Sequence, residues 1–304
     1  MENVSSKEVE SLAGPFAALI GVQIFFGSLP VIGKVVLQAI PAFGLVGLRV
    51  GIAATAFAIV QSARGRFWLR EKGDYSRLAV LSLFGVTFNQ LLFISGLSLT
   101  KASNTSLLAA TIPIFALAVS SILGAEKLRR AKVVGVILAF AGVALLIDPR
   151  KASFSSDSTI GDLLIVTNSL SYGIYVASSK SVITRNGAFR SMMWVFIFAA
   201  IICVPLGLFS LRTVNLPSVD TSLWLLILYI GLGATASPYL LNAWALARVS
   251  PSTVAIFVYL QPLIGFLLAV AFLGEMIDIK FIVAATLVFL GVFLTSRRSS
   301  YSET

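Results

Sequence analysis

Apolar stretches of about 20 residues recur from one end of the chain to the other, and they limit the folds that it can adopt. The chain has 304 residues, of which 58% are hydrophobic and 12% are charged, whereas soluble domains carry about 25% charged residues. In lipid the backbone polar groups must bond to one another, which leaves only helices and closed barrels. The stretches are continuously apolar rather than alternating, which excludes a barrel. We therefore predict an all-α integral membrane protein.

Short connections divide the apolar stretches into ten predicted transmembrane helices. Most connections are only a few residues long, such as residues 39–41, so consecutive helices should run antiparallel. The predicted helices cover residues 15–38, 42–62, 78–99, 105–124, 132–148, 161–183, 190–211, 222–243, 252–273 and 279–296.

The distribution of Lys and Arg predicts which side of the membrane each loop faces, because cytoplasmic loops are enriched in basic residues. With a cytoplasmic N-terminus, the cytoplasmic loops and tails hold 16 Lys and Arg residues, and the opposite loops hold five. We therefore expect a multi-pass protein with both termini in the cytoplasm. This asymmetry also explains the net charge of +10, so no nucleic-acid partner is expected.

Two distant stretches, residues 111–128 and 260–277, have nearly the same order of residues. Pro113 and Pro262 are 149 positions apart, and so are Glu126 and Glu275. The same offset aligns the third to fifth predicted helices with the eighth to tenth, and an offset of 146 aligns the first with the sixth. We therefore predict two five-helix repeats, residues 1–149 and 150–304, within one integrated transmembrane domain.

The two repeats should have opposite orientations in the membrane. Each contains an odd number of helices, so the second enters the membrane from the side that the first did not. The loop charges agree, because residues 63–77 carry five basic residues and their counterpart near 212–221 carries only Arg212. Inverted-topology repeats are common in secondary transporters, whose substrate sites lie near the midplane between the repeats.

Short motifs follow one another in a similar order in the two halves. They are Phe26-Gly27, Arg49, Ile112-Pro113, Glu126 and Gly135 in the first half, and Gly161-Asp162, Tyr172, Gln261-Pro262, Gly274-Glu275 and Gly291 in the second. With these motifs the chain resembles the drug/metabolite transporter superfamily, in particular the EamA-type ten-helix exporters and among them the YddG-type bacterial amino-acid exporters. The resemblance covers residues 14–298. It implies a carrier in the bacterial inner membrane that exports aromatic and other neutral amino acids.

Polar and aromatic residues near the middle of the predicted helices are the candidates for a substrate site. A buried amide needs a hydrogen-bond partner or a wet cavity, and so does a tyrosine hydroxyl at the midplane. Hydrogen bonding between neighbouring helices is the alternative role for each polar residue. The predicted substrate-binding residues are Gln23, Phe26, Asn89, Gln90, Thr111, Asn168, Tyr172, Tyr239 and Gln261.

Three prolines and two basic residues inside the predicted helices also need a role. Pro30, Pro113 and Pro262 are predicted hinges, because proline removes one helical hydrogen bond and frees a carbonyl. A static kink is the alternative. Lys34 and Arg49 lie towards the outer ends of the first two predicted helices. We expect both side chains to extend to the lipid headgroups; alternatively they face the cavity and attract a carboxylate.

The positions of the acidic residues bear on the energy source. None falls in the middle of a predicted helix, and the chain has no histidine. Proton-coupled carriers usually keep such a group within the membrane, so we expect facilitated diffusion or exchange by alternating access rather than proton coupling. The same pattern predicts no metal, no cofactor and no enzymatic activity.

The expected partners are a small solute, foremost an amino acid, and membrane lipid, and we expect a monomer. A broad-specificity drug or metabolite efflux carrier is the alternative function. A channel is disfavoured, because a channel needs a ring of similar polar groups along one pore.

Overall fold

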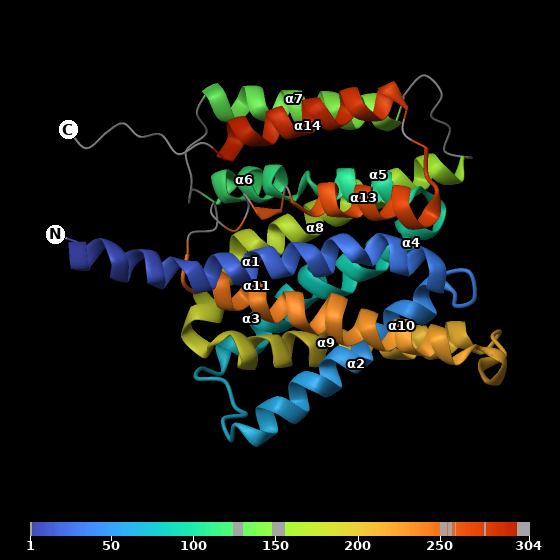
Figure 1. Ribbon diagram of the computed structural model, residues 1–304. Coiled ribbons are helices and arrows are strands. Elements are labelled where there is room, and N and C mark those ends of the chain that lie inside the picture. The colour runs from blue at the N-terminus through green and yellow to red at the C-terminus, as the bar shows by residue number, and fades with distance from the viewer. Residues whose placement is uncertain are drawn as a thin grey trace.

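The computed structural model describes residues 2–123, 130–147, 156–249, 254, 257–258, 260–276 and 278–296. Within these residues every regular element is a helix (Figure 1). The first half contains α1 Glu2–Val36, α2 Ala42–Ala63, α3 Gly73–Ser82, the π-helical segment η1 Leu83–Thr87, α4 Phe88–Leu99, α5 Ala102–Ala109, α6 Ile112–Ile122 and α7 Arg130–Ile147. The second half contains α8 Asp157–Asn186, α9 Ala188–Leu211, the short 3₁₀ helix η2 Leu216–Ser218, α10 Thr221–Gly231, the π-helical segment η3 Leu232–Ala236, α11 Ser237–Leu246, α13 Leu260–Leu273 and α14 Ile279–Ser296.

Long apolar helices dominate the described part of the chain. Seven helical segments are long and apolar enough to cross a membrane: Gly14–Val36, Ala42–Ala63, Gly73–Leu99, Ala102–Ile122, Asp157–Asn186, Ala188–Leu211 and Thr221–Leu246. Three shorter apolar helices are Val133–Gly142, Leu263–Leu273 and Ile279–Gly291. These segments coincide with the ten predicted helices, although the start of the ninth lies outside the described residues. The prediction of an all-helical, multi-pass membrane protein is confirmed.

The largest differences from the predicted boundaries are at α1 and at the fourth predicted helix. Helix α1 begins at Glu2 rather than at residue 15, because no glycine or proline precedes Gly14 and the polar residues there tolerate a helix. The fourth predicted helix is two helices, α5 and α6, which are separated at residues 110–111. The second residue of α6 is Pro113, and proline has no N–H to donate to the carbonyl four residues earlier, that of Ala109, where α5 ends.

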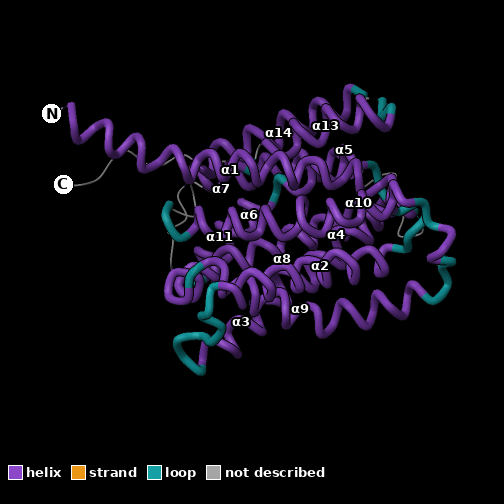
Figure 2. Tube along the Cα trace, turned by 60° about the horizontal axis from the view of Figure 1, so that its bottom comes forward, coloured by secondary structure: helices purple, strands orange, loops and turns teal. Residues whose placement is uncertain are grey.

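The helices form one bundle, and their axes are roughly parallel or antiparallel to one another (Figure 2). Helices α7 and α14 lie side by side at one edge of the bundle, and α2 and α9 lie side by side at the opposite edge (Figure 1). Between these pairs, α1 packs against α11 and α13, while α8 packs against α4 and α6. Under the sequence offsets, α8 is the counterpart of α1, and α4 and α6 are the counterparts of α11 and α13. The first helix of each half therefore packs against helices of the other half, and the two arrangements are equivalent.

The α2–α9 pair shows the relative direction of two counterpart helices. Near the start of α2, a Cβ added to Gly47 would lie 2.7 Å from the Cα of Gly207, near the end of α9. Later in α2, the Phe57 ring lies 5.2 Å from the ring of Phe196, which is earlier in α9. Residue numbers thus rise along one helix while they fall along the other. The two counterparts run antiparallel, which supports the predicted inversion, while the repeat boundaries remain a prediction.

Candidate functional site

A small central cavity, about 40 Å³ in volume, lies between the two halves of the bundle. Small-molecule sites typically measure roughly 300–1,000 Å³, so the cavity must widen to hold a solute. Helices of both halves contribute to its wall. The lining residues are Phe26, Leu29, Arg49, Asn89, Gln90, Phe93, Ala109, Ile112, Asn168, Tyr172, Tyr239 and Gln261.

The central cavity brings together seven of the nine predicted substrate-binding residues. They are Phe26, Asn89, Gln90, Asn168, Tyr172, Tyr239 and Gln261. The other two, Gln23 and Thr111, are buried but do not line it. Gln23 lies on α1 one turn before Phe26, and its Oε1 has no hydrogen-bond partner. Thr111 lies at the break between α5 and α6, where its hydroxyl donates to the carbonyl of Leu108.

A chain of hydrogen bonds joins the polar residues of the cavity wall. Gln90 Nε2 donates to the Tyr239 hydroxyl at 2.9 Å, and these two residues are counterparts under the 149-residue offset. The Tyr239 hydroxyl has two acceptors in reach, the carbonyl of Gly85 at 2.8 Å and Asn89 Oδ1 at 2.9 Å. Asn89 Nδ2 donates to Asn168 Oδ1 at 2.5 Å. The same amides therefore link helices and line the cavity, while their binding of a substrate stays a prediction.

Aromatic rings form the apolar part of the wall. The ring of Tyr239 meets the rings of Phe26 and Tyr172 edge to face, with centroids 5.8 Å and 6.0 Å away. The Tyr172 hydroxyl accepts a hydrogen bond from Asn242 Nδ2 at 3.2 Å. Edge-to-face pairs of this kind hold rings in fixed orientations. The cavity thus offers rigid ring surfaces next to amide groups.

Arg49 contradicts its expected position. Its side chain is 0% exposed and lines the central cavity rather than reaching the headgroups, so that prediction is wrong. Nε donates to Thr235 Oγ1 at 2.8 Å and Nη2 to the carbonyl of Ala234 at 3.2 Å, whereas Nη1 has no partner. The residue is buried because η3 of the second half packs against α2. A lone arginine in an apolar helix was the available signal, since such residues are functional candidates by default.

The two π-helical segments each supply a carbonyl to this region. The segments η1 and η3 are 149 residues apart. π-helical turns disturb the regular helical bonding and are frequent at functional sites. In η1 the Gly85 carbonyl accepts from the Tyr239 hydroxyl, and in η3 the Ala234 carbonyl accepts from Arg49. These carbonyls are counterparts, so the two halves use the same backbone position and different side-chain partners.

The predicted hinge prolines take different places. Pro30 lies inside α1, which continues through it to Val36. Pro113 follows the break between α5 and α6, and Pro262 is the third residue of α13. Their role as hinges stays a prediction.

Lys34 and its counterpart Lys180 have matching environments. Lys34 is half-buried, and its Nζ lies 3.5 Å from the carbonyl of Ser98 at the end of α4. Lys180 Nζ lies 3.3 Å from the carbonyl of Val249, just beyond α11. Cations are favourable near the carbonyl ends of helices. Neither lysine lines the central cavity.

One acidic residue lies deeper in the bundle than expected. Helix α8 begins at Asp157, four residues before the predicted start, so Asp162 lies in its second turn and is 3% exposed. Its Oδ1 accepts from Thr100 Oγ1 at 2.6 Å, and both oxygens lie 3.4 Å from Asn104 Nδ2. Asp162 does not line the central cavity.

The repeated glutamates can be compared only in part, because Glu126 lies outside the described residues. Glu275 accepts from the backbone N–H groups of Ala102 and Ser103 at 2.9 and 3.1 Å, and so caps the N-terminus of α5. In the described part of the chain, no group of three or more Cys, Asp or Glu side chains could hold a metal ion.

Comparison with known proteins identifies relatives across nearly the whole chain. The EamA-like transporter family matches it twice, over residues 13–148 and 159–297. The uncharacterized transporter YyaM of Bacillus subtilis is 23% identical over 289 residues, which cover 92% of this chain and 93% of that protein. The "probable terminal-alkyne amino-acid exporter" of Streptantibioticus cattleyicolor is 23% identical, covering 84% of this chain and 86% of that one.

The fold has also been seen in a crystal. One crystal structure superimposes with a TM-score of 0.64 at 22% identity and covers 91% of this chain and 95% of the other. Both halves match the same family, and together the two matches span most of the sequence. The chain belongs to the EamA-like transporter family, and it is a membrane transporter rather than an enzyme.

Proposed function

We propose that this transporter exports small metabolites, foremost aromatic and other neutral amino acids, and that the central cavity is its substrate site. The observation that carries the proposal is the convergence of residues from both halves on one buried cavity. Ring surfaces there suit an apolar side chain, and amide groups suit the polar end of an amino acid. The relative named as an amino-acid exporter supports this substrate class.

Alternating access follows from the repeated packing of the two halves. The cavity lies where the halves meet, so a rocking motion of one half against the other would open it to each side in turn. The antiparallel α2–α9 contact and the α7–α14 contact lie at opposite edges of the bundle. Both join counterpart helices, and they are the surfaces along which the halves would move. We place both termini in the cytoplasm, the protein in the bacterial inner membrane, and the functional unit as a monomer.

We further propose that transport is facilitative or an exchange. The described residues that line the central cavity include no carboxylate, so none of them takes up a proton with the solute. Asp162 is a buried acid outside this lining, and the proposal requires that it does not take up a proton during transport. If transport in liposomes became concentrative under an imposed pH gradient, the facilitative proposal would be wrong. Loss of that response in Asp162→Asn would then identify Asp162 as the group that takes up the proton.

The test of the main proposal is counterflow in liposomes that contain the purified protein. We expect labelled phenylalanine to accumulate transiently in liposomes preloaded with unlabelled phenylalanine, and the flux to saturate. A panel of amino acids, nucleosides and cationic dyes then separates amino-acid export from broad efflux. Gln261→Ala should reduce counterflow at least about tenfold if a polar contact is lost. Leu267→Ala on the same helix, at a side chain 65% exposed, is the control. Flux without saturation or counterflow would indicate a channel.

A further inference from the structure

The guanidinium of Arg49 is an unbalanced charge inside the transporter. The residue is 0% exposed and donates two hydrogen bonds to neutral groups, the hydroxyl of Thr235 and the carbonyl of Ala234. Arg185 forms ion pairs with Glu71 and Asp74, and both pairs lie near one end of the bundle, away from Arg49. An arginine cannot lose its charge in a protein. Among the residues that the structure describes, the central cavity therefore holds a permanent cation without an acidic side chain in its wall.

Such an arrangement is costly unless something else compensates the charge. Removing an ion from water costs several kcal/mol even after the protein relaxes, and the partners of Arg49 supply dipoles but no negative charge. Its Nη1, which carries two N–H groups, has no partner at all. Buried donors without partners are rare in folded proteins. A donor of this kind on a residue that lines a cavity is available to a bound solute.

The π-helical segments show that the charge is not required for packing. In η1 the carbonyl of Gly85 is satisfied by the neutral hydroxyl of Tyr239. In η3 the counterpart carbonyl of Ala234 is satisfied by Arg49. Because a neutral donor serves one of two equivalent carbonyls, an arginine is not needed for that role in the other. The positive charge and the unpartnered Nη1 remain to be explained.

We propose that Arg49 binds the anionic group of the solute, and that this group is a carboxylate. The planar guanidinium presents parallel N–H groups that match the two oxygens of a carboxylate, with hydrogen bonds about twice as strong as neutral ones. The rest of the solute lies against the rings of Phe26, Tyr172 and Tyr239 on the same wall. This inference rests on the proposed function, and it narrows the substrates to carboxylate-bearing solutes.

The experiment compares acids with their amides on the wild-type protein first. The probes are L-phenylalanine, L-phenylalaninamide, which lacks the carboxylate, and 3-phenylpropionate, which lacks the amine. Each competes with labelled phenylalanine or leucine in counterflow, and each is also tested for thermal stabilisation of the purified protein. We expect both carboxylates to bind about 10- to 100-fold more tightly than the amide, the range of a lost charge-assisted hydrogen bond.

Variants then assign the preference to Arg49. Arg49→Gln should abolish the preference for acid over amide, and Arg49→Lys should keep part of it, because lysine keeps the charge without the planar fork. Ile59→Ala, on the same helix at a side chain 65% exposed, should keep it in full. Since Arg49→Gln could fail to fold, the wild-type comparison and Arg49→Lys carry the test without it.

The outcomes separate the two proposals. If the amide binds wild type as tightly as the acids, or Arg49→Gln keeps the preference, the carboxylate site is wrong while amino-acid export can stand. If 3-phenylpropionate binds through Arg49 and no amino acid does, amino-acid export is wrong while the carboxylate site stands. If no carboxylate binds to the wild-type protein, both are wrong.

Discussion

Tyr239 is the residue at which the two halves meet. Its hydroxyl has one proton and three polar neighbours, the carbonyl of Gly85, Asn89 Oδ1 and Gln90 Nε2. The bond to Gln90 joins two residues that the repeat places at equivalent positions. Two equivalent residues can touch only near the symmetry axis that relates the halves, so this bond marks the centre of the molecule.

Removing the Tyr239 hydroxyl should therefore destabilise the protein more than removing that of Tyr172. Tyr239→Phe removes a donor to the buried carbonyl of Gly85 and the acceptor of Gln90 Nε2, at a cost of about 1–2 kcal/mol. Tyr172→Phe removes one longer bond, from Asn242 at 3.2 Å, and should cost less than about 1 kcal/mol. Thermal unfolding in detergent can be followed by labelling of Cys203, the single, buried thiol of the chain. Equal losses in the two variants would contradict this account of Tyr239.

The same residues show what the sequence can predict about a site. Asn89, Gln90 and Tyr239 were found because an amide or hydroxyl in the middle of an apolar helix is costly, which depends only on local sequence. The prediction that Arg49 reaches the headgroups is wrong because the burial of its side chain depends on η3, which belongs to the other half of the chain. Position along a helix indicates depth in the membrane, but it does not indicate which helix lies alongside.

At the scale of elements, two glycines determine how closely α2 and α9 approach each other. A Cβ on Gly207 would lie 2.6 Å from the Cα of Gly47, a backbone atom that cannot move aside alone. A Cβ on Gly51 would meet only a methyl group of Val204 at 3.4 Å. Small residues at helix contacts allow such close packing in membranes. The α2–α9 contact therefore depends on Gly47 and Gly207 and not on Gly51.

Gly207→Ala should thus destabilise the protein, while Gly51→Ala should be neutral or slightly stabilising. Alanine favours a helix over glycine by about 1 kcal/mol at either position, but overpacking at Gly207 costs typically 1–3 kcal/mol. Circular dichroism during heating gives the midpoint of each variant. A Gly207→Ala variant as stable as Gly51→Ala would show that α2 and α9 separate without cost.

The helices themselves were more predictable than the breaks within them. The apolar stretches locate the helices because burial in lipid depends on composition over about 20 residues. The π-helical segments η1 and η3 and the break at residues 110–111 have weaker signals. Pro113 indicates the break, whereas the π-helical segments contain no proline. Their carbonyls bond to Tyr239 and Arg49, which lie far away in the sequence.

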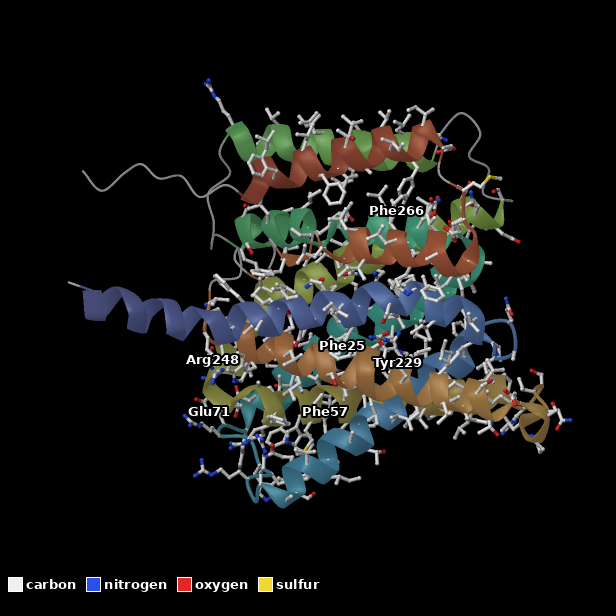
Figure 3. The ribbon with its side chains drawn as sticks, in the orientation of Figure 1. Phe25, Phe57, Glu71, Tyr229, Arg248 and Phe266 are labelled. Atoms are coloured by element: carbon white, nitrogen blue, oxygen red, sulfur yellow. The ribbon has the colours of Figure 1, made fainter. Side chains whose placement is uncertain are left out.

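At the scale of the whole molecule, the counterpart loops lie at opposite ends of the bundle. Residues 64–72 connect α2 to α3 at one end, and residues 212–220 connect α9 to α10 at the other (Figure 1, Figure 2). Figure 3 labels Glu71 and Arg248 near the first of these ends, and Phe25 and Tyr229 further along. Counterpart segments at opposite ends are what an inverted repeat requires. Basic residues concentrate at the first end, which is the cytoplasmic one if the charge rule applies.

Cysteine labelling tests the inversion and the orientation together. Arg66 and Asn215 are counterparts under the 149-residue offset, and both are exposed. In a Cys203→Ala background, a membrane-impermeant maleimide applied to intact cells should label Asn215→Cys. It should label Arg66→Cys only in inside-out vesicles, because the repeats are inverted and the basic loop faces the cytoplasm. Labelling of both positions from one side would refute the inverted repeat, whereas the reverse pattern would keep the inversion and overturn the orientation. The reverse pattern would leave the carboxylate site on Arg49 intact. Labelling of both positions from one side would instead exclude alternating access through two inverted halves.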